Sequence, residues 1–410
     1  MPNSENAPRR KRYLSPRYLA GKVREKGVVW CLRALIARAS WRMRRYFDPL
    51  IKRISWVFPS MRFLLRPVPK SEKRILAIWD FRTVPYSIGD LMVLHERTQI
   101  LRLTHQVDKV DICFVCDPRH PVRKLGQQGV TPDNFHYHFS ALVSTVYLNP
   151  HVGSFFLFDS HDQLEGFVAD NVERYQIWPG GKEYVARHSA YGDNFDSIQD
   201  FFRKNGFIPY LDYRSSTLEW AYTFYRKHIR PDFPVVVHLR NNPFSGAPRN
   251  ARLDAWLEFF KSCEGRFDVK FVLIGAAGEI DERFRHLPNT LIAKDYHSTV
   301  EQDLVLAYSG LIYLGSSSGP SAAAIFSQTP YVIFGYRPAN EIVPYGGRFN
   351  FATDTQKLIW ETETADILME QFSGLFHRVD KLGWEERVER FMASRGRETF
   401  RSHLRWAESS

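Results

Sequence analysis

The sequence predicts an α/β protein built on doubly wound, mainly parallel sheets. Short apolar runs alternate with helical patterns along most of the 410 residues, and this order places successive strands parallel to one another. The runs show little polar alternation, which is typical of strands that are buried on both faces. Loops of small or polar residues follow several of the runs, and ligands of such sheets collect at the carboxyl ends of the strands.

The chain begins with a basic segment that differs from the remainder. Residues 1–70 contain 18 Lys and Arg against 3 Asp and Glu, whereas the rest contains 38 against 42. Within Val28–Phe47, apolar side chains share one helical stripe, and Arg38, Arg42 and Arg45 lie opposite. We expect this amphipathic arm to hold the protein peripherally on an anionic membrane surface, at its cytoplasmic inner face. The alternative is a helix that packs on the body; nucleic acid is not an expected partner.

The first α/β region is expected to span residues 71–215. Strands are predicted at Ile75–Asp80 and Val110–Cys116, with a helix over Leu91–Gln106 between them and weaker strand patterns at 155–158 and 176–178. Cys113 and Cys116 form a C-x-x-C inside an apolar run, without a second pair. They are therefore expected to be core residues rather than zinc ligands.

The second α/β region, residues 216–345, has the clearer pattern. A helix over 218–228 is expected to join the two regions. Strands are predicted at 235–239, 269–274, 291–293, 311–314 and 331–334, with helices at 253–262, 279–285, 300–308 and 320–327. Residues 346–410 are expected to be mainly helical.

The segment Leu311–Gly335 is expected to carry the binding chemistry. Its first strand leads into a loop of small residues, Gly315, Ser316, Ser317, Ser318 and Gly319, and Pro320 and Ser321 begin the next helix. Amides at a helix start, together with serine hydroxyls, form an anion site that suits a phosphate or diphosphate. The alternative is the small-residue turn that any parallel α/β unit needs.

Other strands of the second region end at residues suited to the same ligand. Arg240 and Arg249 are expected to neutralise a diphosphate, and Gly275 leaves room for a nucleotide base. His238 lies at the end of the same strand as Arg240, and Glu301 is a candidate for binding a ribose. Structural roles stay open for three of these residues: a core position for His238, an ion pair for Arg240 and an exposed helix start for Glu301.

These motifs resemble two families of glycosyltransferases. The segment Gly315–Gly335 is similar to the donor-binding segment of heptosyltransferase-like enzymes, with Ser317 and Ser318 where their pattern has Asp-Thr. The segment Ser87–Asp90 looks like the Gly-Asp motif at the start of those enzymes. His238-x-Arg240 is similar to the His-x-Arg of the α1,6-fucosyltransferase type, whose arginine contacts the donor diphosphate. Both families have the GT-B architecture, in which two Rossmann-like domains face a cleft and the C-terminal one holds most of the donor.

The resemblance implies an enzyme that transfers a sugar from a nucleotide-diphosphate donor to a glycan or lipid-linked acceptor, with inversion, in cell-surface polysaccharide synthesis. No Asp-x-Asp occurs in the chain, so arginines and the serine loop, rather than a metal, are expected to stabilise the leaving diphosphate. No cofactor is expected beyond the substrates. Asp90 is the candidate base, with a helix N-cap as its alternative role and Asp80 in reserve.

Two other enzyme classes stay open. Gly315-x-Ser317-x-Gly319 matches the G-x-S-x-G motif of α/β serine hydrolases, with Ser317 as the nucleophile between a strand and a helix. Against this class, Pro320 moves the helix start beyond the proposed nucleophile, and no glycine run for an oxyanion hole is seen. A nucleotide-sugar epimerase with the same architecture is the second alternative.

Overall fold

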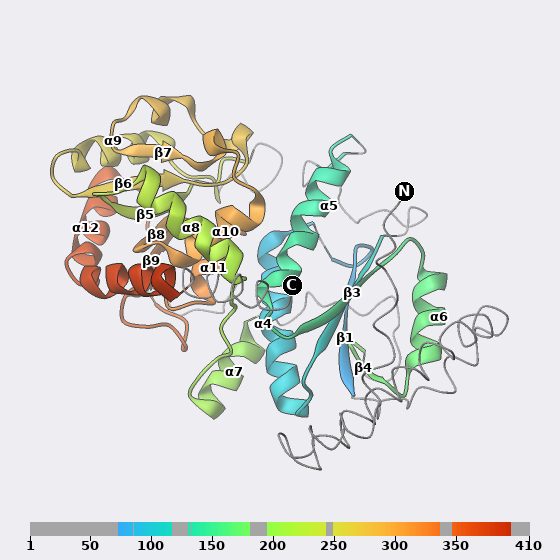
Figure 1. Cartoon of the computed structure of the whole chain (residues 1–410). Helices are drawn as coiled ribbons and strands as arrows, with labels where there is room; N and C mark the ends of the chain where they lie inside the picture. Colours follow the sequence, from blue (N-terminus) through green and yellow to red (C-terminus); the bar gives the residue numbers. More distant parts are fainter. Residues whose placement is uncertain are drawn as a thin grey trace, which may run out of the picture. The chain divides into compact units, whose positions relative to one another are not determined.

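The computed structural model describes residues 73–84, 86–116, 130–131, 133–180, 195–242, 249–336 and 347–394. The chain divides into two compact units, Met1–Ser71 and Glu72–Ser410. The basic arm and its expected helix over Val28–Phe47 lie outside the described residues. Within the second unit we distinguish an N-lobe, residues 73–180, and a C-lobe, residues 215–394 (Figure 1).

The N-lobe contains a four-stranded sheet in the order β3-β2-β1-β4, and every pair in it is parallel. Its strands are β1 (Arg74–Asp80), β2 (Val110–Val115), β3 (Val152–Phe158) and β4 (Tyr175–Trp178). Its helices are α4 (Ile88–His105), α5 (Phe135–Ser144), the short 3-10 helix η3 (Thr145–Leu148) and α6 (His161–Asn171). Separate hydrophobic clusters cover the two faces of the sheet, as a doubly wound arrangement requires.

The C-lobe contains a six-stranded parallel sheet in the order β10-β9-β8-β5-β6-β7. Its strands are β5 (Phe233–His238), β6 (Val269–Leu273), β7 (Thr290–Ile292), β8 (Ile312–Ser316), β9 (Tyr331–Phe334) and β10 (Gln356–Leu358). Its helices are α8 (Ser215–His228), α9 (Leu253–Cys263), α10 (Val300–Ser309), α11 (Ser321–Ile325), α12 (Ala365–Phe376) and one over 381–394. Between the lobes the chain forms α7 (Asp196–Asn205). The strand order reverses direction at β5, which is where such sheets bind ligands.

The strands expected from the apolar runs are confirmed with shifted ends; β3, for example, begins at Val152 rather than Phe155. Two helix predictions are wrong. The helix expected over 279–285 is replaced by the 3-10 turns η5 (Ala277–Glu279) and η6 (Glu282–His286), because the Asp281 side chain caps the second turn. The helix expected over 320–327 is only the five-residue α11. Helices α5, α6 and α7 and strand β10 were not predicted.

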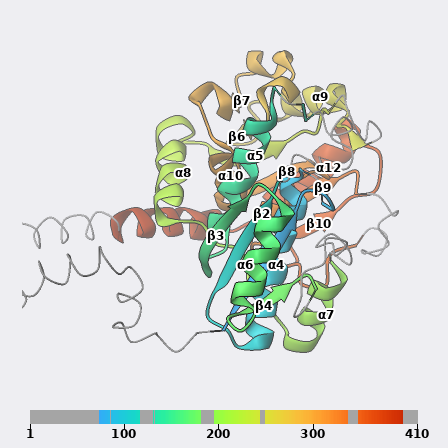
Figure 2. The ribbon, with the colours of Figure 1, turned by 90° about the vertical axis from the view of Figure 1, so that its right-hand side faces the viewer.

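Helix α4 connects the cores of the two lobes. Its Leu91 and Leu94 belong to the N-lobe cluster, whereas Met92 and Val93 belong to the cluster that fills the C-lobe. The start of α4 touches the loop before α11: a Cβ built on Gly89 would lie 3.0 Å from the Cα of Gly319. Helix α5 also lies beside α10 of the C-lobe (Figures 1 and 2). None of the helices in the described part combines the length and apolar character needed to cross a bilayer.

Candidate active site

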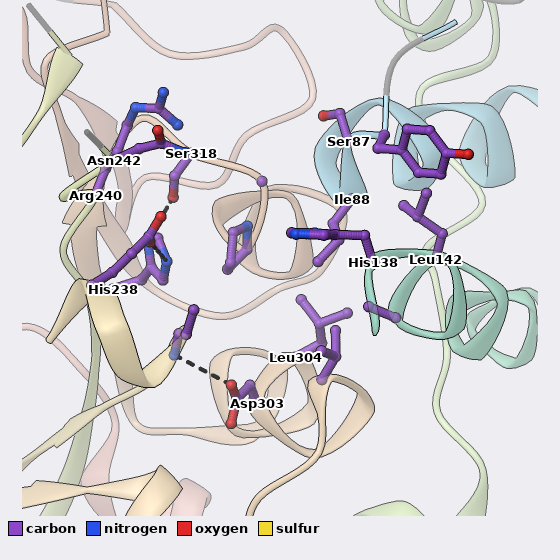
Figure 3. A pocket seen from close by; sticks show the side chains of 18 of the residues that line it. Ser87, Ile88, His138, Leu142, His238, Arg240, Asn242, Asp303, Leu304 and Ser318 are labelled. Carbon is purple, nitrogen blue, oxygen red and sulfur yellow. Dashed lines mark hydrogen bonds and ion pairs between the residues drawn. The ribbon is translucent and has the colours of Figure 1, made fainter. Parts of the chain in front are cut away.

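A cavity of about 610 Å³ lies where the two lobes meet. The C-lobe lines it with the carboxyl ends of β5, β6 and β8 and with the first turns of α10. The N-lobe lines it with the first turn of α4 and one face of α5. In Figure 3, His238, Arg240 and Ser318 stand on one side of this cleft, and Ser87 and Leu142 on the other. The predicted convergence of strand ends on one edge is therefore present in the structure.

The serine loop is shorter than the sequence predicted. Strand β8 continues through Gly315 and Ser316, and Ser316 is only 1% exposed. A Cβ on Gly315 would collide with the carbonyl oxygen of His238, so glycine is required here by strand packing. Gly315 and Ser316 are thus structural residues, which corrects their assignment to ligand binding. The β-pairing of both residues with β9 explains why they cannot form part of a loop.

Two further serines of this segment, Ser317 and Ser321, do not line the cleft. The Ser317 amide donates to the carbonyl of Phe334 at 2.9 Å, and Ser317 does not line the cavity. The Ser321 hydroxyl donates to the carbonyl of Ser318 at 2.5 Å and is buried. The residues of this segment that do line the cleft are Ser318, Gly319 and Pro320. Helix α11 has only five residues, so its dipole adds little to any anion site.

His238 is hydrogen-bonded to the serine loop. Its Nδ1 lies 2.8 Å from the Oγ of Ser318, and the residue is 5% exposed. Burial lowers the pKa of His238 to about 4, and the nearby charge of Arg240 acts in the same direction. The imidazole is therefore neutral at physiological pH. Gly275, with φ of 125°, lies against this ring, because a Cβ there would come within 3.0 Å of it.

Arg240 and Arg249 both line the cleft, as predicted. Burial lowers the pKa of Arg240, and the positive charge of Arg249 lowers it further, so the two guanidinium groups repel each other. Glu279 acts against this effect from the same cleft. Arg249 is held by an Nη2 hydrogen bond of 3.1 Å to the carbonyl of Ser317. Arg240 and Arg249 lie in the same cleft as the Ser318 hydroxyl. An anion bound there would reduce the repulsion between the two guanidinium groups.

Glu301 is not in the cleft, which corrects its assignment as a ribose ligand. It accepts hydrogen bonds from Arg214 at 3.1 and 2.5 Å and from Thr217 at 2.7 Å, and so it ties α10 to α8. Asp303 lines the cleft instead. Residues two apart on a helix point in different directions, so only one of these two carboxylates can face the ligand.

Asp303 and Glu279 are the cleft carboxylates that the sequence did not reveal. Asp303 accepts hydrogen bonds from Ser298 at 2.5 Å and from the Gly275 amide at 3.2 Å, and it pairs with Lys294 at 2.8 Å. Burial raises the pKa of Glu279, against the influence of Arg240. The sequence offered one signal for each of them: Glu279 comes shortly after the apolar run of β6, and Asp303 lies in the first turn of α10.

Asp90 lies in the cleft within the first turn of α4. The N-cap of this helix is Ser87, whose Oγ accepts from the Asp90 amide at 3.4 Å, so capping is not the role of Asp90. Burial raises the pKa of Asp90, and the Ser87 hydroxyl and Arg249 oppose the rise. The reserve candidate Asp80 is 2% exposed and is bound to His161 at 2.9 Å. Asp80 does not line the cleft.

The geometry of the loop does not support a serine hydrolase. Ser317 does not line the cleft, and the histidine bonded to this loop contacts Ser318 instead. That histidine is too weak a base near neutral pH, with its pKa lowered to about 4. Among the described residues, no group of three or more His, Cys, Asp or Glu is arranged to hold a metal ion.

No protein-family model and no curated protein matches the chain. Solved structures of several glycosyltransferases are similar to it. A family 9 glycosyl transferase from Veillonella parvula is 11% identical over 76% of this chain and 91% of that one, with a TM-score of 0.46. The ADP-heptose LPS heptosyltransferase II of E. coli is 11% identical over 74% of this chain and 98% of its own, also with a TM-score of 0.46. The fucosyltransferase NodZ from Bradyrhizobium is 12% identical over 62% and 93%, with a TM-score of 0.32.

At these identities and TM-scores the similarity does not establish an activity for this chain. The two parallel α/β lobes and the cleft between them give the chain an architecture of the GT-B kind, as the resemblance implied.

Proposed function

We infer that the protein is a glycosyltransferase that uses a nucleoside-diphosphate sugar and an acceptor hydroxyl. The observation that carries this inference is the pair of mutually repelling guanidinium groups, Arg240 and Arg249, in a cleft that also contains the Ser318 hydroxyl. A diphosphate would accept hydrogen bonds from both guanidinium groups and reduce the repulsion between them. Arg240 follows β5 at the switch point of the sheet, where a parallel α/β lobe holds a nucleotide.

The two sides of the cleft divide the reaction between them. The Asp90 carboxylate takes the proton of the acceptor hydroxyl, and the acceptor oxygen forms a bond to the anomeric carbon. The bond from that carbon to the diphosphate oxygen breaks, and the leaving diphosphate keeps the electron pair. Arg240, Arg249 and Ser318 stabilise this charge as it develops. A base with a raised pKa, such as Asp90, is better matched to this task than an ordinary carboxylate. A single displacement of this kind inverts the anomeric configuration.

A thermal-shift screen with GDP, ADP, UDP, CDP and inorganic pyrophosphate tests the inference. A ligand that binds only the folded state raises the melting temperature in proportion to the logarithm of its concentration over Kd. We expect at least one nucleoside diphosphate to stabilise the protein and Arg240→Ala to abolish the shift. Arg283→Ala is the matched control, because Arg283 pairs with Asp254 and Asp281 away from the cleft. A wild type that responds to none of the compounds would refute the inference.

The membrane role of the basic arm remains a prediction, because residues 1–70 lie outside the described part of the chain. We expect the full-length protein to bind vesicles that contain anionic lipid, and a variant without residues 1–70 to lose this binding while it keeps nucleotide affinity. Equal vesicle binding by the two proteins would discard the arm as a membrane anchor. A glycan or lipid-linked molecule as the acceptor is likewise a proposal.

A further inference from the structure

Helix α5 brings an N-lobe aromatic residue to the nucleotide side of the cleft. The helix lies beside α10, whose first turn forms part of the C-lobe wall. Tyr137 and His138, near the start of α5, line the same cavity as Gly275 and Asp303. In Figure 3 the ring of His138 points from α5 into the cleft. Tyr137, which the sequence did not mark as functional, thus lines the same cavity as Gly275, the predicted base site.

Much of the Tyr137 side chain is exposed. It is 53% exposed although it lines a cavity. Its ring meets the His138 ring edge to face at a centroid distance of 5.3 Å. Burial and the carboxylates of Asp303 and Glu279 raise the pKa of Tyr137, so its hydroxyl stays protonated and lies within the electrostatic reach of both C-lobe carboxylates.

The C-lobe backbone after β6 carries only small side chains. Gly275, whose backbone conformation favours glycine, and Ala276 both line the cavity. The Gly275 amide is already held by Asp303 at 3.2 Å, which fixes the backbone plane. An exposed ring in the same cavity as a backbone stretch with small side chains suits a planar heteroaromatic group, which stacks on aromatic side chains whatever its substituents.

We propose that Tyr137 stacks on the base of the nucleotide donor and holds it against the backbone at Gly275 and Ala276, so that both lobes contact the donor. The proposal rests on the proposed function. It assigns to the N-lobe a share of donor affinity in addition to its catalytic Asp90. The diphosphate remains with Arg240 and Arg249, at the other end of the nucleotide.

The test compares a full nucleotide with the diphosphate alone. Isothermal titration calorimetry is carried out on wild type, Tyr137→Ala and Tyr137→Phe, with the nucleoside diphosphate that binds best and with inorganic pyrophosphate. Loss of one stacking contact is worth about 1–3 kcal/mol, so Tyr137→Ala should weaken nucleotide binding by about 5- to 150-fold. Tyr137→Phe should keep affinity within about threefold, because the ring remains. Pyrophosphate affinity should be unchanged in both variants.

Tyr296→Ala is the matched control. Tyr296 is 43% exposed and packs on His228, and it does not line the cleft, so its loss should not alter nucleotide binding. Unchanged nucleotide affinity in Tyr137→Ala would overturn the proposal, including the case in which that variant loses only transfer to the acceptor. Equal weakening of pyrophosphate would also overturn it, because the effect would not be on the base. A wild type that binds pyrophosphate but no nucleotide would refute the stacking alone, whereas one that binds neither would refute the proposed function as well.

Discussion

The two lobes present different chemistry to the same cleft. The C-lobe contributes three cationic side chains and two carboxylates there, Arg240, Arg249, Lys294, Glu279 and Asp303. Among the described N-lobe residues that line the cleft, Asp90 is the only carboxylate, and the others are mainly hydroxyl, aromatic and aliphatic groups. Burial lowers the pKa of His138, so this N-lobe histidine is uncharged near neutral pH. The difference supports the proposal that the C-lobe binds the diphosphate, whereas the N-lobe deprotonates the acceptor hydroxyl.

This contrast predicts that binding and chemistry can be separated by mutation. The largest effect should come from Asp90→Asn, which removes the base and keeps the shape. We expect turnover to fall by about 10²- to 10⁴-fold, the usual contribution of a general base. Nucleotide affinity should stay close to that of the wild type. Asp295→Asn is the control, because Asp295 pairs with Arg285 outside the cleft. An Asp90→Asn enzyme with full turnover would remove Asp90 from the mechanism.

The raised pKa of Asp90 also predicts a pH dependence with a defined sign. Because burial raises this pKa in the folded protein, the ionised carboxylate is disfavoured by folding and destabilises the native state at neutral pH. Asp90→Asn should therefore raise the melting temperature at pH 7, and the gain should disappear as the pH falls below the unfolded-state pKa. Activity of the wild type should fall as the pH is lowered through the raised pKa. Melting curves from about pH 3 to 8 and rates over the same range measure both effects, and a gain in melting temperature that persists undiminished at about pH 3 would contradict the first.

An intermediate effect on stability and nucleotide binding is expected from Gly319→Ala, at the contact between Gly319 of the C-lobe and Gly89 of the N-lobe. A Cβ on Gly319 would lie 3.1 Å from the amide nitrogen of Gly89, so Gly319→Ala must push the serine loop away from α4. Overpacking of this kind typically costs about 1–3 kcal/mol. We expect a lower free energy of unfolding in urea and weaker nucleotide binding together. Gly278→Ala, where nothing lies within 4 Å, should leave both unchanged. Wild-type stability in Gly319→Ala would contradict the prediction and show that the contact between Gly319 and Gly89 yields without cost.

The smallest effect is expected from Ser318→Ala. The change removes one hydroxyl from the anion site and leaves Nδ1 of His238 without its 2.8 Å partner. A single hydrogen bond is worth about 0.5–1.5 kcal/mol, so nucleotide affinity should fall by about 2- to 12-fold. Ser317→Ala should have no such effect, because Ser317 does not line the cleft. Calorimetry on both variants measures their nucleotide affinity. A larger loss of affinity in Ser317→Ala than in Ser318→Ala would restore Ser317 as a ligand or nucleophile.

The sequence located the C-lobe half of the cleft more completely than the N-lobe half. Arg240, Arg249 and Gly275 could be predicted because each follows an apolar run of a parallel sheet or its adjoining loop, and such ends share one edge. Helix α5 was missed because the region from 131 to 210 combines aromatic and polar residues without a clear period. Tyr137 therefore had no assigned element from which its position could be argued.

The errors within the serine loop and at α10 have local causes. Gly315 and Ser316 were placed in a loop because small residues usually end a strand, yet pairing with β5 and β9 extends β8 through them. Glu301 was chosen over Asp303 although both lie in the first turn of α10. The sequence shows that these two carboxylates diverge, but not which side of the helix faces the ligand.

By itself, the sequence determined the alternation of strands and helices, and hence two parallel sheets with ligand-binding edges in this order along the chain. Those features follow from local periodicity and from residues that end strands and begin helices. Only the tertiary structure decided which hydroxyls and carboxylates meet across the lobes, such as Ser318 rather than Ser317 and Asp303 rather than Glu301. The physical reason is that a repeat pattern fixes the direction of a side chain relative to its own element. The packing of distant elements, here α4 and α5 against the C-lobe, then decides what that side chain faces.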